Sequence, residues 1–158
     1  MTPFRWSLGF VLLICVTACS DTAGAPEAGT DTLLKLAAQD YLKREDSPYV
    51  ITQAEYQGAK DDRWWVFQLS DPYEAAVDAG YDAEDLDRHL YDIPLGMLAA
   101  AIDGVDMDVS TYIISFREPC QLVYEIDAAD AEALAGDSLS TDDVIDRMEI
   151  SDLTGCQG

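Results

Sequence analysis

This chain has four cysteines, and the chemistry expected of each depends on the residues around it. Cys15 and Cys19 lie at the end of an N-terminal apolar run, whereas Cys120 and Cys156 lie in the last third of the chain. A cysteine thiolate is a strong nucleophile that can accept a lipid, ligate a metal or form a disulfide. The sequence around each cysteine therefore decides which of these reactions we expect.

The apolar run before Cys19 is short. Every residue of 8–16 except Gly9 is apolar, and the preceding residues carry one charge, Arg5. A permanent span of the ~30 Å hydrocarbon core needs ~20 apolar residues, so this run is too short. The pattern is typical of a secretory signal peptide, and residues 1–18 are excluded from the predicted fold.

The tetrapeptide Val16-Thr17-Ala18-Cys19 resembles the lipobox of bacterial lipoproteins, although leucine is commoner than valine at its first position. The resemblance implies that the Cys19 thiol receives diacylglycerol, that a peptidase cuts after Ala18, and that the new amino terminus is acylated. Stable attachment to a membrane takes at least two acyl chains. Ser20 stands where some enteric lipoproteins carry an aspartate that retains them in the inner membrane, so the resemblance favours the outer membrane. The alternative is an ordinary signal peptide in which Cys19 is incidental.

Cys120 and Cys156 are the two thiols that remain once Cys15 leaves with the signal peptide and Cys19 carries lipid. An even pair of thiols in an oxidising compartment predicts a disulfide. Closing the loop 120–156 would stabilise the fold by about 4 kcal/mol in the chain-entropy model. A metal site on these two cysteines would need histidines, and the chain has one, His89.

The charge balance restricts the partners. The chain has 9 basic and 31 acidic residues, a net charge of −22 at pH 7. Arg5 is the only charged residue of 1–18, so cleavage leaves 8 basic residues and a net charge of −23. Coulomb repulsion excludes a nucleic-acid or anionic-lipid partner, while a cationic partner, metal ions or no partner remain.

No catalytic motif accompanies these features. A catalytic triad around His89 would need a nucleophile frame such as G-x-S-x-G, and no Walker loop, dinucleotide-binding glycine pattern or H-E-x-x-H is present. The EF-hand pattern also fails, and irregular ion binding at residues 82–87 is the remaining metal hypothesis. We therefore assign no catalytic residue, no cofactor and no metal site.

Aromatic residues supply the candidate binding surface. Trp64 and Trp65 are adjacent in a predicted strand, so their side chains must lie on opposite faces of the sheet. Trp65 shares its parity with Phe67 and Leu69, which predicts a core position. Trp64 lies on the other face with Val66, which is either covered by another element or an exposed contact surface. Three tyrosines of the acidic middle region could extend this surface: Tyr73, Tyr81 and Tyr91.

The N-terminal half of the mature chain has a legible pattern. Residues 19–31 lack any aliphatic side chain larger than alanine and predict a flexible tether, with one domain over 32–158. Helical spacing of Leu33, Leu36, Ala37, Asp40 and Tyr41 predicts a helix over 32–44. Residues 49–57 and 63–69 form a predicted hairpin, and alternation places Val50, Thr52, Ala54 and Tyr56 on one side of its first strand.

The rest of the domain predicts short helices over 72–79, 83–90, 95–102, 128–135 and 141–148, and a second hairpin over 109–116 and 121–126. This order indicates an α+β fold, with an antiparallel sheet of about four strands in two hairpins and helices packed on one face.

These features predict a membrane-anchored bacterial lipoprotein whose small acidic exported domain is a non-enzymatic binding or structural module of the cell envelope. Its contact surface, near Trp64 and residues 73–91, would bind either an envelope protein or a small ligand. Two alternatives remain: an envelope hydrolase that uses a pair of carboxylates, and a cation-binding surface lipoprotein.

Overall fold

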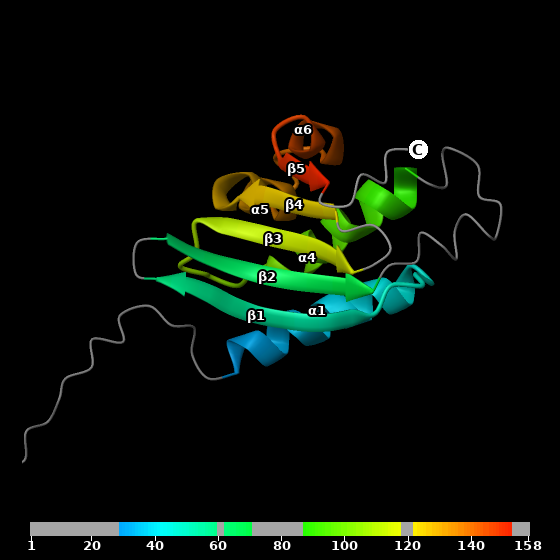
Figure 1. Ribbon diagram of the computed structural model, residues 1–158, viewed down its shortest axis with the longest axis horizontal. Helices are drawn as coiled ribbons and strands as arrows, with labels where there is room; N and C mark the ends of the chain where they lie inside the picture. Colours follow the sequence, from blue (N-terminus) through cyan, green and yellow to red (C-terminus); the bar gives the residue numbers. More distant parts are fainter. Residues whose placement is uncertain (1–28, 60–61, 71–86, 118–121, 153–158) are drawn as a thin grey trace, which may run out of the picture.

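The structure is a computed structural model that describes residues 29–59, 62–70, 87–117 and 122–152 (Figure 1). In chain order its elements are α1 (Thr30–Arg44), β1 (Ile51–Ala59), β2 (Asp62–Ser70), the π-helix η1 (Arg88–Asp92), α4 (Ile93–Ile102), β3 (Thr111–Arg117), β4 (Leu122–Asp127), α5 (Ala128–Ala135), α6 (Thr141–Ile145) and β5 (Glu149–Asp152). The helix α1 begins at Thr30, so the last two residues of the predicted tether belong to the domain.

The predicted α+β class is confirmed, but the sheet differs from the predicted one. The described part of the chain forms a sheet of five strands in the order β1-β2-β3-β4-β5, and β2 pairs with β3 in parallel. The two predicted hairpins, β1–β2 and β3–β4, are antiparallel as expected, and β5 adds an antiparallel edge strand beside β4. A parallel pair needs a crossover of a dozen or more residues, and the segment between β2 and β3, which contains α4, provides it.

The start of β3 is fixed against β2 by hydrogen bonds. Ser110 donates its backbone N–H (2.7 Å) and its hydroxyl (2.8 Å) to the carbonyl oxygen of Arg63. The Arg63 guanidinium, which is almost fully buried, forms an ion pair with Asp108 in the same connection. These contacts set the register that places Trp64 beside Thr111.

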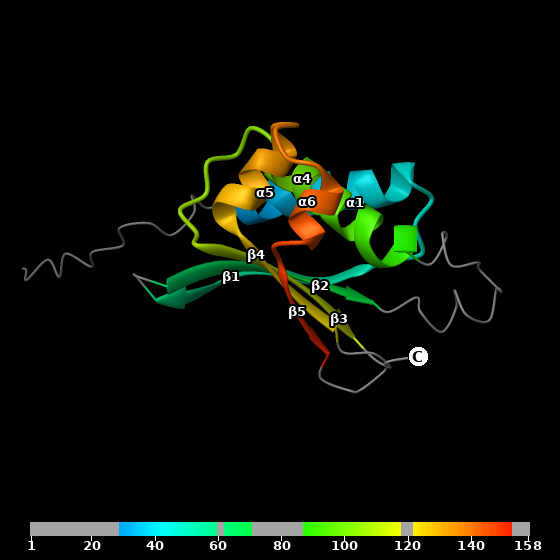
Figure 2. The same cartoon turned by 90° about the horizontal axis from the view of Figure 1, so that it is seen from above.

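All the described helices lie on one face of the sheet, as predicted (Figure 2). Between the two layers lies a core of fully buried side chains, to which α4 contributes on nearly every turn because it lies against α1, α5 and η1. The largest of the fully buried side chains are those of Trp65, Tyr112, Tyr124 and Phe67. The opposite face of the sheet has no described element over it (Figures 1 and 2).

The buried face of α1 is not the predicted one. Leu34, Ala38 and Leu42 are buried, whereas Leu33 and Leu36 are exposed by 62% and 54%. Both sets recur at helical spacing, so periodicity alone favours neither. Contact with α4 and β1 selects the stripe that contains Leu34.

The predicted alternation along β1 is interrupted by a β-bulge. The register shifts between Ile51 and Gln53, and as a result Ile51 and Ala54 both face the core. Val50 and Thr52, which were predicted to share a side with Ala54, are exposed instead. An extra residue in one strand changes the side on which the following side chains lie, and hydrophobic alternation does not reveal it.

A proline explains the π-helix that precedes α4. Pro94 has no N–H to donate to the carbonyl of Leu90, four residues earlier. The N–H of Ile93 donates to the carbonyl of Arg88, one residue before its α-helical partner His89. The carbonyls of His89 and Leu90 therefore lack their usual α-helical donors. Two tyrosine hydroxyls from elsewhere in the fold donate to them, that of Tyr49 to His89 and that of Tyr124 to Leu90.

Candidate functional site

The open face of the sheet carries the side chains that alternate with the core residues of each strand. In β2, Arg63, Trp65, Phe67 and Leu69 are buried toward the helices. Trp64 and Val66 point to the other face and are partly exposed. The predictions that Trp65 is a core residue and that Trp64 lies on the opposite face are therefore confirmed.

One row of residues crosses this face at right angles to the strands. The strand registers pair each residue of the row with the next. Its members, from β1 to β5, are Glu55, Val66, Ile113, Glu125 and Glu149. The centre of the row is thus aliphatic, and carboxylates stand on both sides of it.

A parallel row of paired residues lies on each side of this one, and most residues at the ends of these two rows are polar. Trp64 lies between Gln57 of β1 and Thr111 of β3. On the other side of the Val66–Ile113 pair, Gln68 and Ser115 lie side by side, followed by Val123 of β4. Together, Trp64, Val66 and Ile113 form the apolar centre of the open face, and we use that name for these three residues.

The Trp64 indole is held in place by β1. Its Nε1–H donates to Oε1 of Gln57 at 3.3 Å, and Nε2 of Gln57 donates to Glu55. Trp65 differs, because its buried Nε1 has no hydrogen-bond partner among the described residues. Trp64 therefore presents an oriented aromatic ring, and the same hydrogen-bond chain fixes the Glu55 carboxylate beside it.

Tyr91 does not belong to this face. Its ring stacks on that of Tyr124, with centroids 5.8 Å apart and an interplanar angle of 20°, and Tyr124 is a core residue. Trp64 and Tyr91 thus lie on opposite sides of the sheet, and the predicted common surface of the two is wrong. The other two predicted tyrosines, Tyr73 and Tyr81, lie outside the described residues.

The predicted surface lacked Glu55, Ile113 and Glu125. Alternation along β3 places Ile113 on the face of the sheet opposite to that of the buried Tyr112 and Ile114, and this signal was available in the sequence. The contact between Val66 and Ile113 was not available in the sequence, because it depends on the parallel pairing of β2 with β3. Residues from four strands become adjacent only through that register.

The buried tyrosines of the helical side have structural roles. Burial raises the pKa of Tyr124 far above its ordinary value, and Tyr91 and Tyr49 nearby act in the same direction. Burial also raises the pKa of Tyr112 to about 12, with a smaller contribution from Glu132 and Asp106. Both hydroxyls stay protonated at neutral pH, and that of Tyr124 serves as a hydrogen-bond donor to Leu90.

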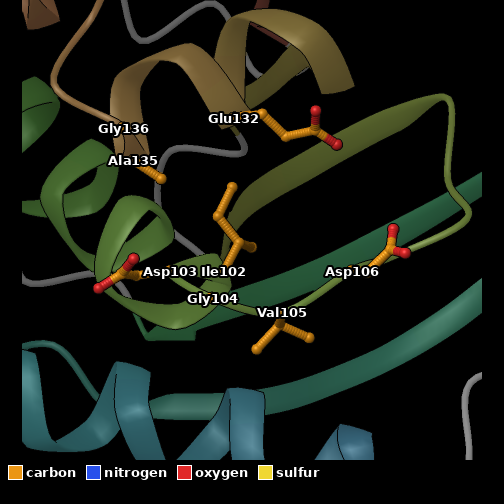
Figure 3. Close-up of a pocket in the computed structure, with 8 residues that line it drawn as sticks. All are labelled: Ile102, Asp103, Gly104, Val105, Asp106, Glu132, Ala135 and Gly136. Carbon is orange, nitrogen blue, oxygen red and sulfur yellow. The ribbon is translucent and has the colours of Figure 1, made fainter.

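A shallow pocket of about 400 Å³ lies where the end of α4 meets α5 (Figure 3). Three carboxylates line it, from Asp103, Asp106 and Glu132, and all three residues are exposed. Figure 3 shows them standing apart around the rim without converging on one point. A general acid of a hydrolase needs desolvation, and a metal needs converging ligands, so this pocket supports neither alternative function.

Searches against protein-family models, curated proteins and solved structures find no match for this chain. Within the described ranges, no helix is long and apolar enough to cross a membrane, and no three metal-ligating side chains converge. The side chains of the open face are therefore the basis for a functional proposal.

All three cysteines with a predicted role in the mature chain, Cys19, Cys120 and Cys156, lie outside the described residues, as do residues 82–86 of the suggested ion-binding stretch. Two described strands each have one end near Cys120 or Cys156 in the sequence. Leu122, at the start of β4, pairs with Asp152, at the end of β5. In the sequence, Cys120 stands two residues before Leu122 and Cys156 four residues after Asp152.

Proposed function

We propose that this protein is a lipid-anchored envelope protein whose domain binds another protein through the open face of its sheet. The observation that carries the proposal is the row from Glu55 to Glu149, in which aliphatic side chains occupy the centre of a sheet face that no described element covers. Sheets with one free face normally place polar residues on it. An oriented tryptophan beside two aliphatic residues is instead typical of a protein contact surface.

The anchor is proposed from the resemblance of residues 16–19 to a lipobox. Lipid on Cys19 would be joined to α1 by the short segment that ends at Gly29, which is rich in alanine, glycine and small polar residues. Such a composition predicts a flexible linker, which would let the domain turn its open face toward a neighbour in the envelope.

Mass spectrometry of the protein purified from the cells that make it tests the anchor. We expect a chain that begins at residue 19 and carries diacylglycerol on Cys19, and a Cys19→Ser variant that is neither lipidated nor retained in the membrane fraction. A native chain that begins at Met1, or one with an unmodified Cys19, would contradict the anchor.

Site-specific photocrosslinking in those cells tests the binding surface. A photoreactive amino acid at Val66, in the row, should give an adduct of defined mass. The same group at Gln39, an exposed position of α1 on the helical side, serves as the matched control. We expect the Val66 adduct to disappear in a Trp64→Ala background and the Gln39 position to give none. Equal adducts from both positions, or none from either, would contradict a binding role for this face.

The disulfide between Cys120 and Cys156 is proposed as a brace of the same sheet. It would join the chain next to the paired ends of β4 and β5, where the four-residue strand β5 pairs with β4 alone among the described strands. Because β4 and β5 carry Glu125 and Glu149, the brace would also hold one acidic side of the open face in register.

A further inference from the structure

We infer that the partner of the open face is a basic amphipathic α-helix, with an apolar stripe flanked on both sides by lysine or arginine. The inference rests on the proposed function and specifies the chemistry of the partner. Three observations carry it: the width of the apolar centre, the carboxylates on both sides of it, and the charge of the rest of the chain.

The width of the apolar centre fits a helix. Trp64 and Val66 lie on β2 and Ile113 on β3, so the centre is two strands wide. The nearest carboxylates in the row lie one strand further out, Glu55 on β1 and Glu125 on β4. Adjacent strands are about 4.8 Å apart, which separates these two positions by roughly 14 Å. A helix with its side chains is about 10–12 Å across and would fit between them.

The carboxylates specify the charge of that helix. Glu125 and Glu149 are exposed, and Glu55 is held near Trp64 through Gln57. The five described strands contain two basic residues: the guanidinium of Arg63 points into the helical side and pairs with Asp108, and Arg117 is the last residue of β3, four residues beyond Ile113. Lysine or arginine on both flanks of a bound helix would therefore meet opposite charge, and could also stack on the indole of Trp64.

Charge also disfavours three other possible occupants of the face, namely a second copy of the chain and two segments of the same chain. A second copy of the chain would bring a net charge of −22 in its unprocessed form against carboxylates, and the two faces would repel each other. The longest internal segment outside the described residues, 71–86, has six acidic residues and no basic one. Residues 19–28 contain Asp21 and Glu27 and no basic residue. Neither segment has the charge that the face would select.

Isothermal titration calorimetry with three synthetic peptides tests the inference. The probe is a leucine–lysine peptide with a leucine stripe flanked by lysines. The controls are the same peptide with every lysine replaced by glutamate, and a scrambled leucine–lysine peptide of identical composition. We expect the full mature protein, in detergent, to bind the probe alone, with a dissociation constant that rises about tenfold or more from low to high salt because the flanking contacts are ionic.

Matched variants of the protein locate the contact. Glu55→Gln and Glu125→Gln should each weaken binding about three- to tenfold, and Trp64→Ala more than that. Asp40→Asn removes the same charge from an exposed position of α1, on the helical side, and should leave binding unchanged. Circular dichroism of each variant verifies that the fold is intact. Binding of the glutamate peptide, or equal losses in Asp40→Asn and Glu125→Gln, would overturn the inference.

The outcomes separate the inference from the function on which it rests. If the Val66 photocrosslink forms but the probe does not bind, the open face is a binding surface and the basic-helix partner is wrong. If neither the photocrosslink nor binding of the probe is observed, the proposed function and the inference are both wrong. If sedimentation shows that the protein itself dimerises and that Trp64→Ala abolishes the dimer, the occupant is a second copy and the basic-helix inference is overturned.

Discussion

The hydroxyl of Tyr124 donates a hydrogen bond of 3.0 Å to the carbonyl oxygen of Leu90, across the interface between β4 and η1. Leu90 is the residue whose α-helical donor would be Pro94, which has no N–H. A side chain from the sheet thus compensates for a break in the helical layer. The π-helix and the sheet are coupled by this bond and by the similar bond from Tyr49 to His89.

Removal of the Tyr124 hydroxyl should destabilise the fold. Tyr124→Phe leaves the Leu90 carbonyl without this donor, so we expect the free energy of unfolding to fall by about 1–3 kcal/mol. Urea denaturation followed by circular dichroism measures the change. In a Pro94→Ala background the helix regains an N–H near Leu90, and the same substitution should cost less. An equal cost in both backgrounds would show that Tyr124 does not compensate for Pro94.

Gly96 allows α1 and α4 to approach each other. A Cβ atom at position 96 would overlap the Tyr41 hydroxyl and lie 2.6 Å from its Cζ atom. We therefore expect Gly96→Ala to lower the free energy of unfolding by about 1–3 kcal/mol, despite the better helix propensity of alanine. Thermal denaturation measures the loss. Gly136→Ala, with its closest atom at 3.4 Å, is the control and should cost less. Identical effects would show that the contact with Tyr41 is not the cause.

The buried tyrosines predict the alkaline limit of stability. Burial raises the pKa of Tyr112 from 10.0 to about 12 and that of Tyr124 further, so both are ionised more readily in the unfolded chain. Their contribution to stability is complete below pH 10 and is lost as the pH rises from 10 toward 12. Absorbance at 295 nm should show two tyrosines that ionise only when circular dichroism reports unfolding. Ionisation of every tyrosine near pH 10 in the folded state would contradict this prediction.

Loss of the proposed disulfide should weaken the β4–β5 edge. We expect Cys156→Ser to lower the free energy of unfolding by about 2–4 kcal/mol, because the loop 120–156 is no longer closed in the unfolded chain. The reduced wild type should match the variant, and a thiol assay on the denatured, unreduced wild type should find no free cysteine. Two free thiols in that assay would show that the bond is absent.

Local patterns determined much of the fold. The alternation in β2 correctly separates Trp64 from Trp65, since adjacent strand residues must point to opposite faces. The helix α5 has the predicted bounds, with Asp127 accepting a hydrogen bond from Ala129 at its start. At the start of α6, Ser140 forms a capping box with Asp143. These features depend on residues close together in the sequence, so a single sequence contains the signal.

Only the tertiary structure decided which surfaces meet. Leu33 and Leu34 both lie on apolar stripes of α1, and contact with α4 and β1 selected Leu34 for the core. The bulge after Ile51, the fifth strand and the parallel pairing of β2 with β3 depend on residues far apart in the chain. The same pairing created the candidate site, because Val66 and Ile113 are neighbours only in that register. Such pairings are set by the packing of the whole domain, which periodicity within one segment does not encode.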